Sequence, residues 1–300
     1  MKFLSCTAMT FIVGIFLAVL NAAENKPGTQ IPPGFEMVKG SAEDTNGWAS
    51  EIRHKDTGLE MVYVAPGEFM MGSPLSEKDR ADDQIQHKVK LTKGFYIGKY
   101  EVTQGQWDKI MGRNPNVDPP VDPKCKNFPV KQISWNECKT FCEKLGETSS
   151  SASAQGGLRR DDGNRFRLPS EAEWEFAARG GNKSKGFIYS GSNNLDEVAW
   201  YSSNSETKMH EVGQKKANEL GIFDMSGNVW EWCSDFYGEY PSENVTDPAG
   251  VPPGYDHVTR GGSWYTKDWR CRIAVRNIIM MVDRWYALGF RLAMDIPISK

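Results

Sequence analysis

Hydrophobic and polar residues alternate along two segments in the first third of the chain, and this alternation predicts β-strands. The segments are GLEMVYVAPGEFMMGS (residues 58–73) and HKVKLTKGFYIGKYEV (residues 87–102). Each is centred on a dipeptide typical of a turn, Pro66-Gly67 in the first and Lys93-Gly94 in the second. We therefore expect each segment to fold as a hairpin.

Three helices are predicted by a shared pattern, a Ser or Thr followed three residues later by Glu or Gln. In this capping box, each of the two side chains accepts a hydrogen bond from an otherwise unpaired backbone N–H group at the start of the helix. The pairs are Thr103/Gln106, Ser134/Glu137 and Ser170/Glu173, and glycines at 112, 146 and 180 are expected to end the three helices.

The rest of the chain is poor in long periodic patterns. Residues 147–163 (ETSSSASAQGGLRRDDG) are small and polar, as is typical of a flexible surface insertion. Beyond Gly180 the chain consists of short Trp-rich segments broken by Gly, Asn, Asp and Pro. These segments are too aromatic for solvated coil, so we expect a packed region rich in loops.

The N-terminus predicts export. Residues 1–23 combine Lys2 with a long apolar stretch and small residues at the end, the pattern of a secretory signal peptide, with an uncleaved membrane anchor as the alternative. We expect a polar linker or an irregular lead-in over 24–46, one domain over 47–295 and a short tail over 296–300. The protein is then secreted or periplasmic, without membrane contact beyond the signal segment.

Composition excludes one large class of partner. The chain of 300 residues has 36 Lys plus Arg against 39 Asp plus Glu, a formal net charge of −3. Nucleic-acid-binding proteins usually carry a basic stripe, and none is present, so no nucleic-acid partner is expected. The common phosphate-binding, hydrolase and zinc-protease motifs are also absent from the sequence.

A succession of motifs resembles the formylglycine-generating enzyme (sulfatase-modifying factor) family. In chain order these motifs include YIGKYEVTQGQW, RFRLPSEAEWEFAARGG, GIFDMSGNVWEW, RGGSW and LGFRLA, and the similarity covers roughly residues 47–295. The resemblance implies an α+β fold, a single mixed domain of C-type-lectin-like type with little regular secondary structure. It also implies a core held by aromatic side chains and calcium.

The resemblance further implies a catalytic groove, but one of its elements is missing here. The family's enzymes oxidise a sulfatase cysteine with copper(I) held by two thiolates spaced C-x4-C after a GGS motif, and soft thiolates suit that ion. In this chain the third residue after Ser263 is Thr266, and Cys271 is the only nearby thiol. Trp230 and Ser263 match residues that line the family's groove, although both are also compatible with purely structural roles.

A calcium site is the second implication of the resemblance. The segment DMSGNVWE places its ligands at Asp224, Gly227, Val229 and Glu231, and oxygen ligands from an irregular loop suit calcium. The alternative is that Asp224 and Glu231 only cap a turn through hydrogen bonds.

Five cysteines follow the signal segment, at positions 125, 138, 142, 233 and 271. An odd number leaves at least one thiol unpaired. We expect Cys138 and Cys142 to be buried apolar residues, and Cys233 to form a disulfide with Cys271. The alternative is a free Cys271 thiol that can bind copper.

Together these observations predict a secreted family member that acts as a maturation or binding factor on an exported protein, possibly a sulfatase, or on a glycan. The alternative is an active oxidase that uses Cys271 and copper. We expect the protein to be a monomer with bound Ca2+.

Overall fold

The computed structural model describes residues 29–44, 47–112, 125–151 and 165–296. The predicted signal segment (1–23) and most of the 147–163 insertion lie outside these residues. No helix in the described ranges is long and apolar enough to cross a membrane.

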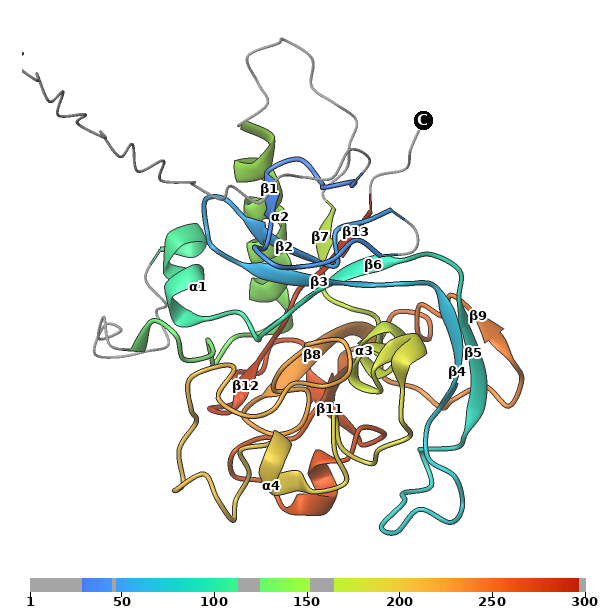
Figure 1. Ribbon diagram of the computed structural model, residues 1–300. Helices are drawn as coiled ribbons and strands as arrows, with labels where there is room; N and C mark the ends of the chain where they lie inside the picture. The colour runs from blue at the N-terminus through green and yellow to red at the C-terminus, as the bar shows by residue number, and fades with distance from the viewer. Residues whose placement is uncertain (1–28, 45–46, 113–124, 152–164, 297–300) are drawn as a thin grey trace, which may run out of the picture.

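Three sheets and a few helices form the fold (Figure 1). The six-stranded sheet has the order β1 (Phe35–Met37), β2 (Glu51–His54), β3 (Glu60–Val64), β6 (Phe95–Gly98), β13 (Ala293–Asp295) and β7 (Phe166–Arg167). The four-stranded sheet has the order β11 (Arg276–Met280), β10 (Asp256–Arg260), β8 (Trp230–Phe236) and β12 (Leu288–Gly289). The three-stranded sheet consists of β4 (Gly67–Met71), β5 (His87–Leu91) and β9 (Val245–Thr246).

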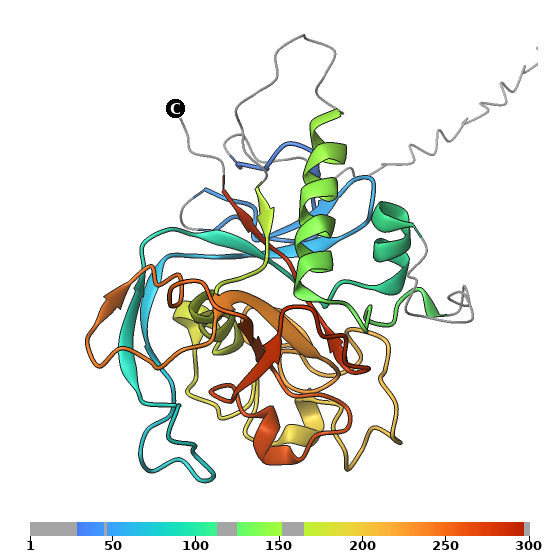
Figure 2. The ribbon, with the colours of Figure 1, turned by 180° about the vertical axis from the view of Figure 1, so that it is seen from behind.

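The helices are α1 (Gln104–Met111), α2 (Trp135–Ser151), α3 (Glu171–Ala178) and α4 (Leu195–Val198), with short 3-10 helices η2 (Gly181–Lys183) and η3 (Asp268–Cys271). Seen from behind, α2 lies across the six-stranded sheet, while the four-stranded sheet sits below it (Figure 2). This mixture of short strands and few helices confirms the predicted α+β class.

The capping boxes form as predicted, and α1 and α3 end where expected. At the start of α1, the Thr103 hydroxyl accepts a hydrogen bond from the Gln106 N–H, and the Gln106 side chain accepts one from the Thr103 N–H. Ser170 and Glu173 form the same reciprocal pair at the start of α3. The predicted end of α2 at Gly146 is wrong, because the helix continues to Ser151. Gly146 is not among the glycines with positive φ, whereas Gly112 ends α1 at φ 75°. A glycine that keeps helical angles only weakens a helix, by about 1 kcal/mol, and does not end it.

The two predicted hairpins are wrong in their pairing, although their strands are present. β3 pairs with β6, and β4 pairs with β5, in both cases antiparallel. The chain therefore runs out along β3 and β4 and returns along β5 and β6, as one long bent ribbon that joins two sheets (Figure 1). Alternation along a strand does not specify its partner, and Pro66, which lacks an N–H group, lies at the bend.

The folded unit begins earlier than the predicted boundary at residue 47. β1 lies within the segment assigned to a linker and pairs with β2. Phe35 of β1 is buried in the largest hydrophobic core, together with Trp107, Trp230 and Trp232. Part of the 24–46 segment is thus an edge strand of the six-stranded sheet.

The predicted disulfide is wrong, because all five cysteines in the described residues are free thiols. Cys233 packs in the core around Trp174 and Phe176, whereas Cys271 packs in a separate small cluster with Leu195 and Val198. The two thiols therefore pack in different clusters and are not bonded to each other. Cys138 and Cys142 are buried in the largest core, which confirms their predicted apolar role.

Candidate functional site

The site is built by the loop that leaves β10. Gly261 and Gly262 both adopt positive φ, at 98° and 78°. A Cβ atom on Gly262 would lie 2.8 Å from the Cys271 sulfur, so a larger residue would displace this cysteine. The double glycine thereby folds the loop back and brings η3 against the strand end.

Ser263 and Cys271 lie beneath the surface, joined through Thr266. The Thr266 hydroxyl accepts a hydrogen bond from the Ser263 N–H at 2.9 Å and lies 3.5 Å from the Cys271 sulfur. Ser263 and Cys271 are fully buried, and the Ser263 Oγ atom has no hydrogen-bond partner. A hydroxyl at position 266 therefore stands beside the Cys271 thiol, five residues before it in the chain.

Burial disfavours the thiolate form of Cys271. Loss of hydration raises its pKa to about 12, against the smaller opposing effect of the Thr266 hydrogen bond. In the absence of a metal ion, this high pKa keeps the thiol protonated near neutral pH.

Trp230 and Thr266 both line an open cavity. The cavity has a volume of about 340 Å³ and is lined by Trp230, Thr266, Lys267, Trp269, Arg270 and Asn277, in addition to Tyr265 and Trp285. A second cavity of about 430 Å³ shares Tyr265 and Trp285 and adds Gln132, Arg284 and Tyr286. We call the two together the aromatic groove.

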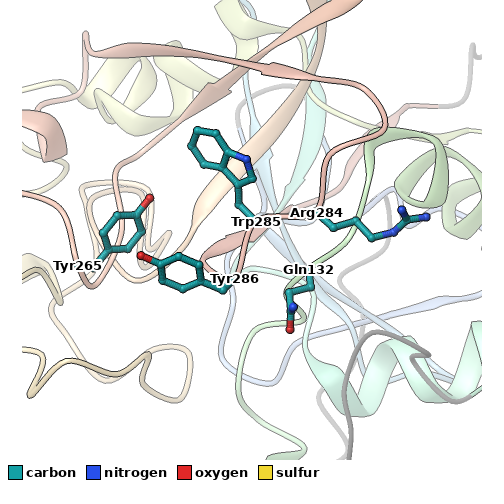
Figure 3. A pocket seen from close by; sticks show the side chains of 5 residues that line it. All are labelled: Gln132, Tyr265, Arg284, Trp285 and Tyr286. Atoms are coloured by element: carbon teal, nitrogen blue, oxygen red, sulfur yellow. The ribbon is translucent and has the colours of Figure 1, made fainter.

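The groove is lined by residues of β8, β11 and η3 and of the loops that contain Gln132, Tyr265 and Trp285. Figure 3 shows Tyr265 and Tyr286 side by side, with Trp285 pointing away from them and Arg284 extending to the far side. The ring centroids of Tyr265 and Tyr286 are 5.0 Å apart. Trp269, Trp285 and Tyr286 are 42%, 39% and 49% exposed, which is unusual for aromatic residues in a protein with buried Trp cores.

Of the three groove residues predicted from the sequence, Trp230 lines the groove, while Ser263 and Cys271 lie behind its wall. Sequence reasoning missed the exposed aromatics and Arg270. The only available signal was the density of Trp and Tyr in RGGSWYTKDWRC and DRWY, which does not separate core from surface.

The predicted calcium residues lie in the buried turn that precedes β8 and at the start of β8, to which Glu231 belongs. Asp224, Gly227, Val229 and Glu231 are all buried, and Asp224 and Gly227 adopt positive φ at 57° and 84°. Glu231 is bound on both oxygens, because Arg291 donates to Oε2 at 2.6 Å and to Oε1 at 2.7 Å. Trp174 Nε1 also donates to Oε2, at 2.8 Å.

Asp224 has one free oxygen. Its Oδ2 atom accepts from the Gly213 N–H at 2.7 Å, whereas Oδ1 is buried without a partner. Burial, with a smaller contribution from Glu231, raises the pKa of Asp224 to about 6. In the described residues no group of three or more His, Cys, Asp and Glu side chains is arranged to hold a metal ion. One oxygen of Asp224 is therefore unpartnered, whereas both oxygens of the Glu231 carboxylate are bound by Arg291.

Comparison with known proteins places this geometry in a family. Residues 49–296 match the sulfatase-modifying factor enzyme 1-like domain. The chain is 36% identical over 207 residues to the chaperone protein LppX of Paenibacillus barcinonensis, covering 57% of this chain and 69% of that protein. It is 30% identical over 195 residues to the formylglycine-generating enzyme of Streptomyces coelicolor, covering 58% of this chain and 54% of that enzyme.

Solved structures agree with this assignment. Treponema denticola variable protein 1 has a TM-score of 0.66 and 32% identity, over 79% of this chain and 95% of its own. PvdO from Pseudomonas aeruginosa also has a TM-score of 0.66, with 26% identity, over 82% of this chain and 98% of its own. The match to the serine/threonine-protein kinase Pkn1 of Chlamydia trachomatis, at 28% identity, covers 82% of this chain but only 40% of that kinase. With the domain match extending over most of its length, this chain belongs to the sulfatase-modifying factor enzyme 1-like family, the formylglycine-generating enzyme family.

Proposed function

We propose that this protein is a binding factor for the maturation of exported polypeptides and that it does not perform copper-dependent oxidation. The observation that carries the proposal is that a Thr266 hydroxyl, and not a second thiol, lies beside the Cys271 thiol. The groove next to this pair is open and is lined by aromatic side chains. The groove supplies a binding surface, while the pair beneath it lacks the second sulfur.

The pair of groups at 266 and 271 does not fit copper(I). This soft ion prefers thiolate ligands, and a neutral threonine hydroxyl is a hard, weak ligand. Copper would supply oxygen activation where two thiolates hold it, and we assign no such step to this chain.

Two observations support a polypeptide as the bound partner. The exposed Trp269, Trp285 and Tyr286 provide large apolar contact area at low entropic cost, a property of protein-binding surfaces. In addition, a relative at 36% identity is named a chaperone. An N-terminal signal segment at residues 1–23 would place the protein among exported chains, in the periplasm or outside the cell. Glycan binding is the competing outcome of the experiments below.

The chemical part of the proposal is tested with copper. Purified protein, copper and oxygen should leave a cysteine-containing sulfatase-motif peptide unchanged, as scored by mass spectrometry. Thr266→Cys should create the C-x4-C pair and raise copper(I) affinity by at least about tenfold in a competition assay with a chromogenic chelator, whereas Thr266→Ser should not. Wild-type turnover that disappears in Cys271→Ser would instead establish the oxidase alternative.

The binding part is tested by fluorescence polarisation with labelled, unstructured peptides in which Val alternates with Glu, Gln or Lys, and with a labelled neutral oligosaccharide. At least one peptide should bind, and Trp285→Ala should weaken that binding by about tenfold or more, as removal of a central aromatic contact does. Binding of the oligosaccharide alone would overturn the polypeptide proposal.

A further inference from the structure

Within the described residues, the partly buried Arg270 has no acidic partner. Its guanidinium lies 5.4 Å from the ring centroid of Trp230 and 5.4 Å from that of Trp269. Its Nη2 atom donates to Asn277 Oδ1 at 3.0 Å, and its Nε atom is without a partner. By contrast, four other arginines of the described chain that are largely buried each form an ion pair with a glutamate: Arg260, Arg272, Arg276 and Arg291.

The setting of Arg270 suits a carboxylate ligand. The two indole rings contact the guanidinium, and Asn277 accepts a hydrogen bond from one of its nitrogens. The side chain is therefore already ordered, so binding a ligand costs little additional conformational entropy. A planar guanidinium with unused N–H groups binds carboxylates through two parallel hydrogen bonds.

The charge of the groove is also one-sided. All of its charged lining residues are cations, namely Lys267, Arg270 and Arg284. Arg284 pairs with Glu137 at 3.0 Å, but Lys267 and Arg270 form no ion pair within the described residues. Two uncompensated cations therefore face the groove.

The strand that carries Asn277 adds a feature specific to polypeptides. β11 is the edge of the four-stranded sheet, with β10 on one side and no described strand on the other. Met281 donates to the Tyr255 carbonyl beyond the end of β10, so by the alternation of an antiparallel ladder the backbone of Ile278 points outward. Ile278 and Met280 are 44% and 51% exposed, so apolar side chains border this open edge.

We propose that the aromatic groove selects extended acidic polypeptides, with a Glu or Asp carboxylate bound by Arg270 between Trp230 and Trp269 and the peptide backbone paired to β11 at Ile278. The inference rests on the proposed function and specifies the partner of the same groove. Hydrogen bonds between the peptide backbone and β11 provide affinity that does not depend on the peptide's side chains, whereas Arg270 provides specificity for acidic sequences.

The peptide series separates this inference from the function on which it rests. The Glu/Val peptide should bind at least about tenfold more tightly than the Gln/Val peptide at low salt, and the difference should shrink as salt rises. Arg270→Gln should remove the preference for Glu, and Arg270→Lys should restore it only in part, because lysine lacks the planar fork. Arg53→Gln, in an exposed pair with Glu60 on the other sheet, is the matched control and should change nothing.

Backbone pairing is tested at the open edge. Ile278→Pro removes an outward N–H without breaking the bonds to β10, so the protein should stay folded while peptide binding weakens by about tenfold, whereas Ile278→Val should bind normally. Equal binding of the Glu and Gln peptides, with Trp285→Ala still harmful, would overturn the acidic preference and leave polypeptide binding intact. Failure of every peptide to bind would overturn both proposals.

Discussion

The buried pair of Glu231 and Arg291 allows a sharp test of what holds the site's scaffold together. Both side chains have no exposed surface, and they form two parallel hydrogen bonds of 2.6 and 2.7 Å. Arg291 also donates to the carbonyl oxygens of Gly98 and Phe223, so it ties the six-stranded sheet to β8 and to the turn before β8. The perturbation we consider is Glu231→Gln.

The expected cost follows from the charge that remains. Glutamine keeps the shape and can still accept one hydrogen bond, but it leaves the buried Arg291 cation without the carboxylate that pairs with it, and only the charges of Glu101 and Asp224, for which no hydrogen bond to Arg291 is found, remain nearby. Breaking a buried pair by removing one partner costs about 3–5 kcal/mol. Replacing both residues, by Glu231→Gln with Arg291→Met, removes the uncompensated charge, so the double variant should lose less than the sum of the two single variants.

Urea unfolding followed by tryptophan fluorescence measures these free energies. Arg53→Gln breaks an exposed ion pair with Glu60 and should cost no more than about 1 kcal/mol, which makes it the matched control. If Glu231→Gln lowered the free energy of unfolding by less than about 1 kcal/mol, or if the effects of the two single variants were strictly additive, Glu231 and Arg291 would not form a strongly coupled buried ion pair. The same contacts make Glu231→Ala a poor test of calcium, since it destabilises the fold with or without an ion.

Two further predictions concern buried carboxylates. Calcium is better tested at Asp224. Chelation should lower the melting temperature of the wild type by about 5 °C, because a ligand present at about 100 times its Kd stabilises the folded state by ~2.7 kcal/mol. Chelation should not change the melting temperature of Asp224→Asn. An unchanged wild-type melting curve on chelation would contradict the calcium site expected from the sequence. Burial, and secondarily the charge of Glu171, raises the pKa of Asp235 to about 7. The folded state therefore retains a proton that the unfolded state releases near pH 3.9, so stability falls as pH rises from about 4 to about 7. Asp235→Asn should flatten urea-derived stability across this window, and an identical pH slope in the variant would contradict the assignment.

The sequence by itself determined the features whose causes are local. The starts of α1, α2 and α3 were predictable because a capping box is complete within four residues, and the ends of α1 and α3 because their glycines change conformation there. The family and its α+β class followed from ordered motifs along the chain. The absence of a second thiol at position 266 was also readable from one residue, since the spacing to Cys271 lies within a single loop.

Only the tertiary structure decided which distant groups meet. Alternation predicted β3, β4, β5 and β6 but not that the outgoing pair would bind the returning pair, because strand pairing is chosen by the whole sheet. The hidden partner of Glu231 lies 60 residues later, at Arg291. The Arg270 guanidinium lies near the ring of Trp230 only because η3 packs near the start of β8, 40 residues earlier in the chain. Charge compensation and burial are properties of surroundings assembled from several segments, so no local pattern in the chain can specify them.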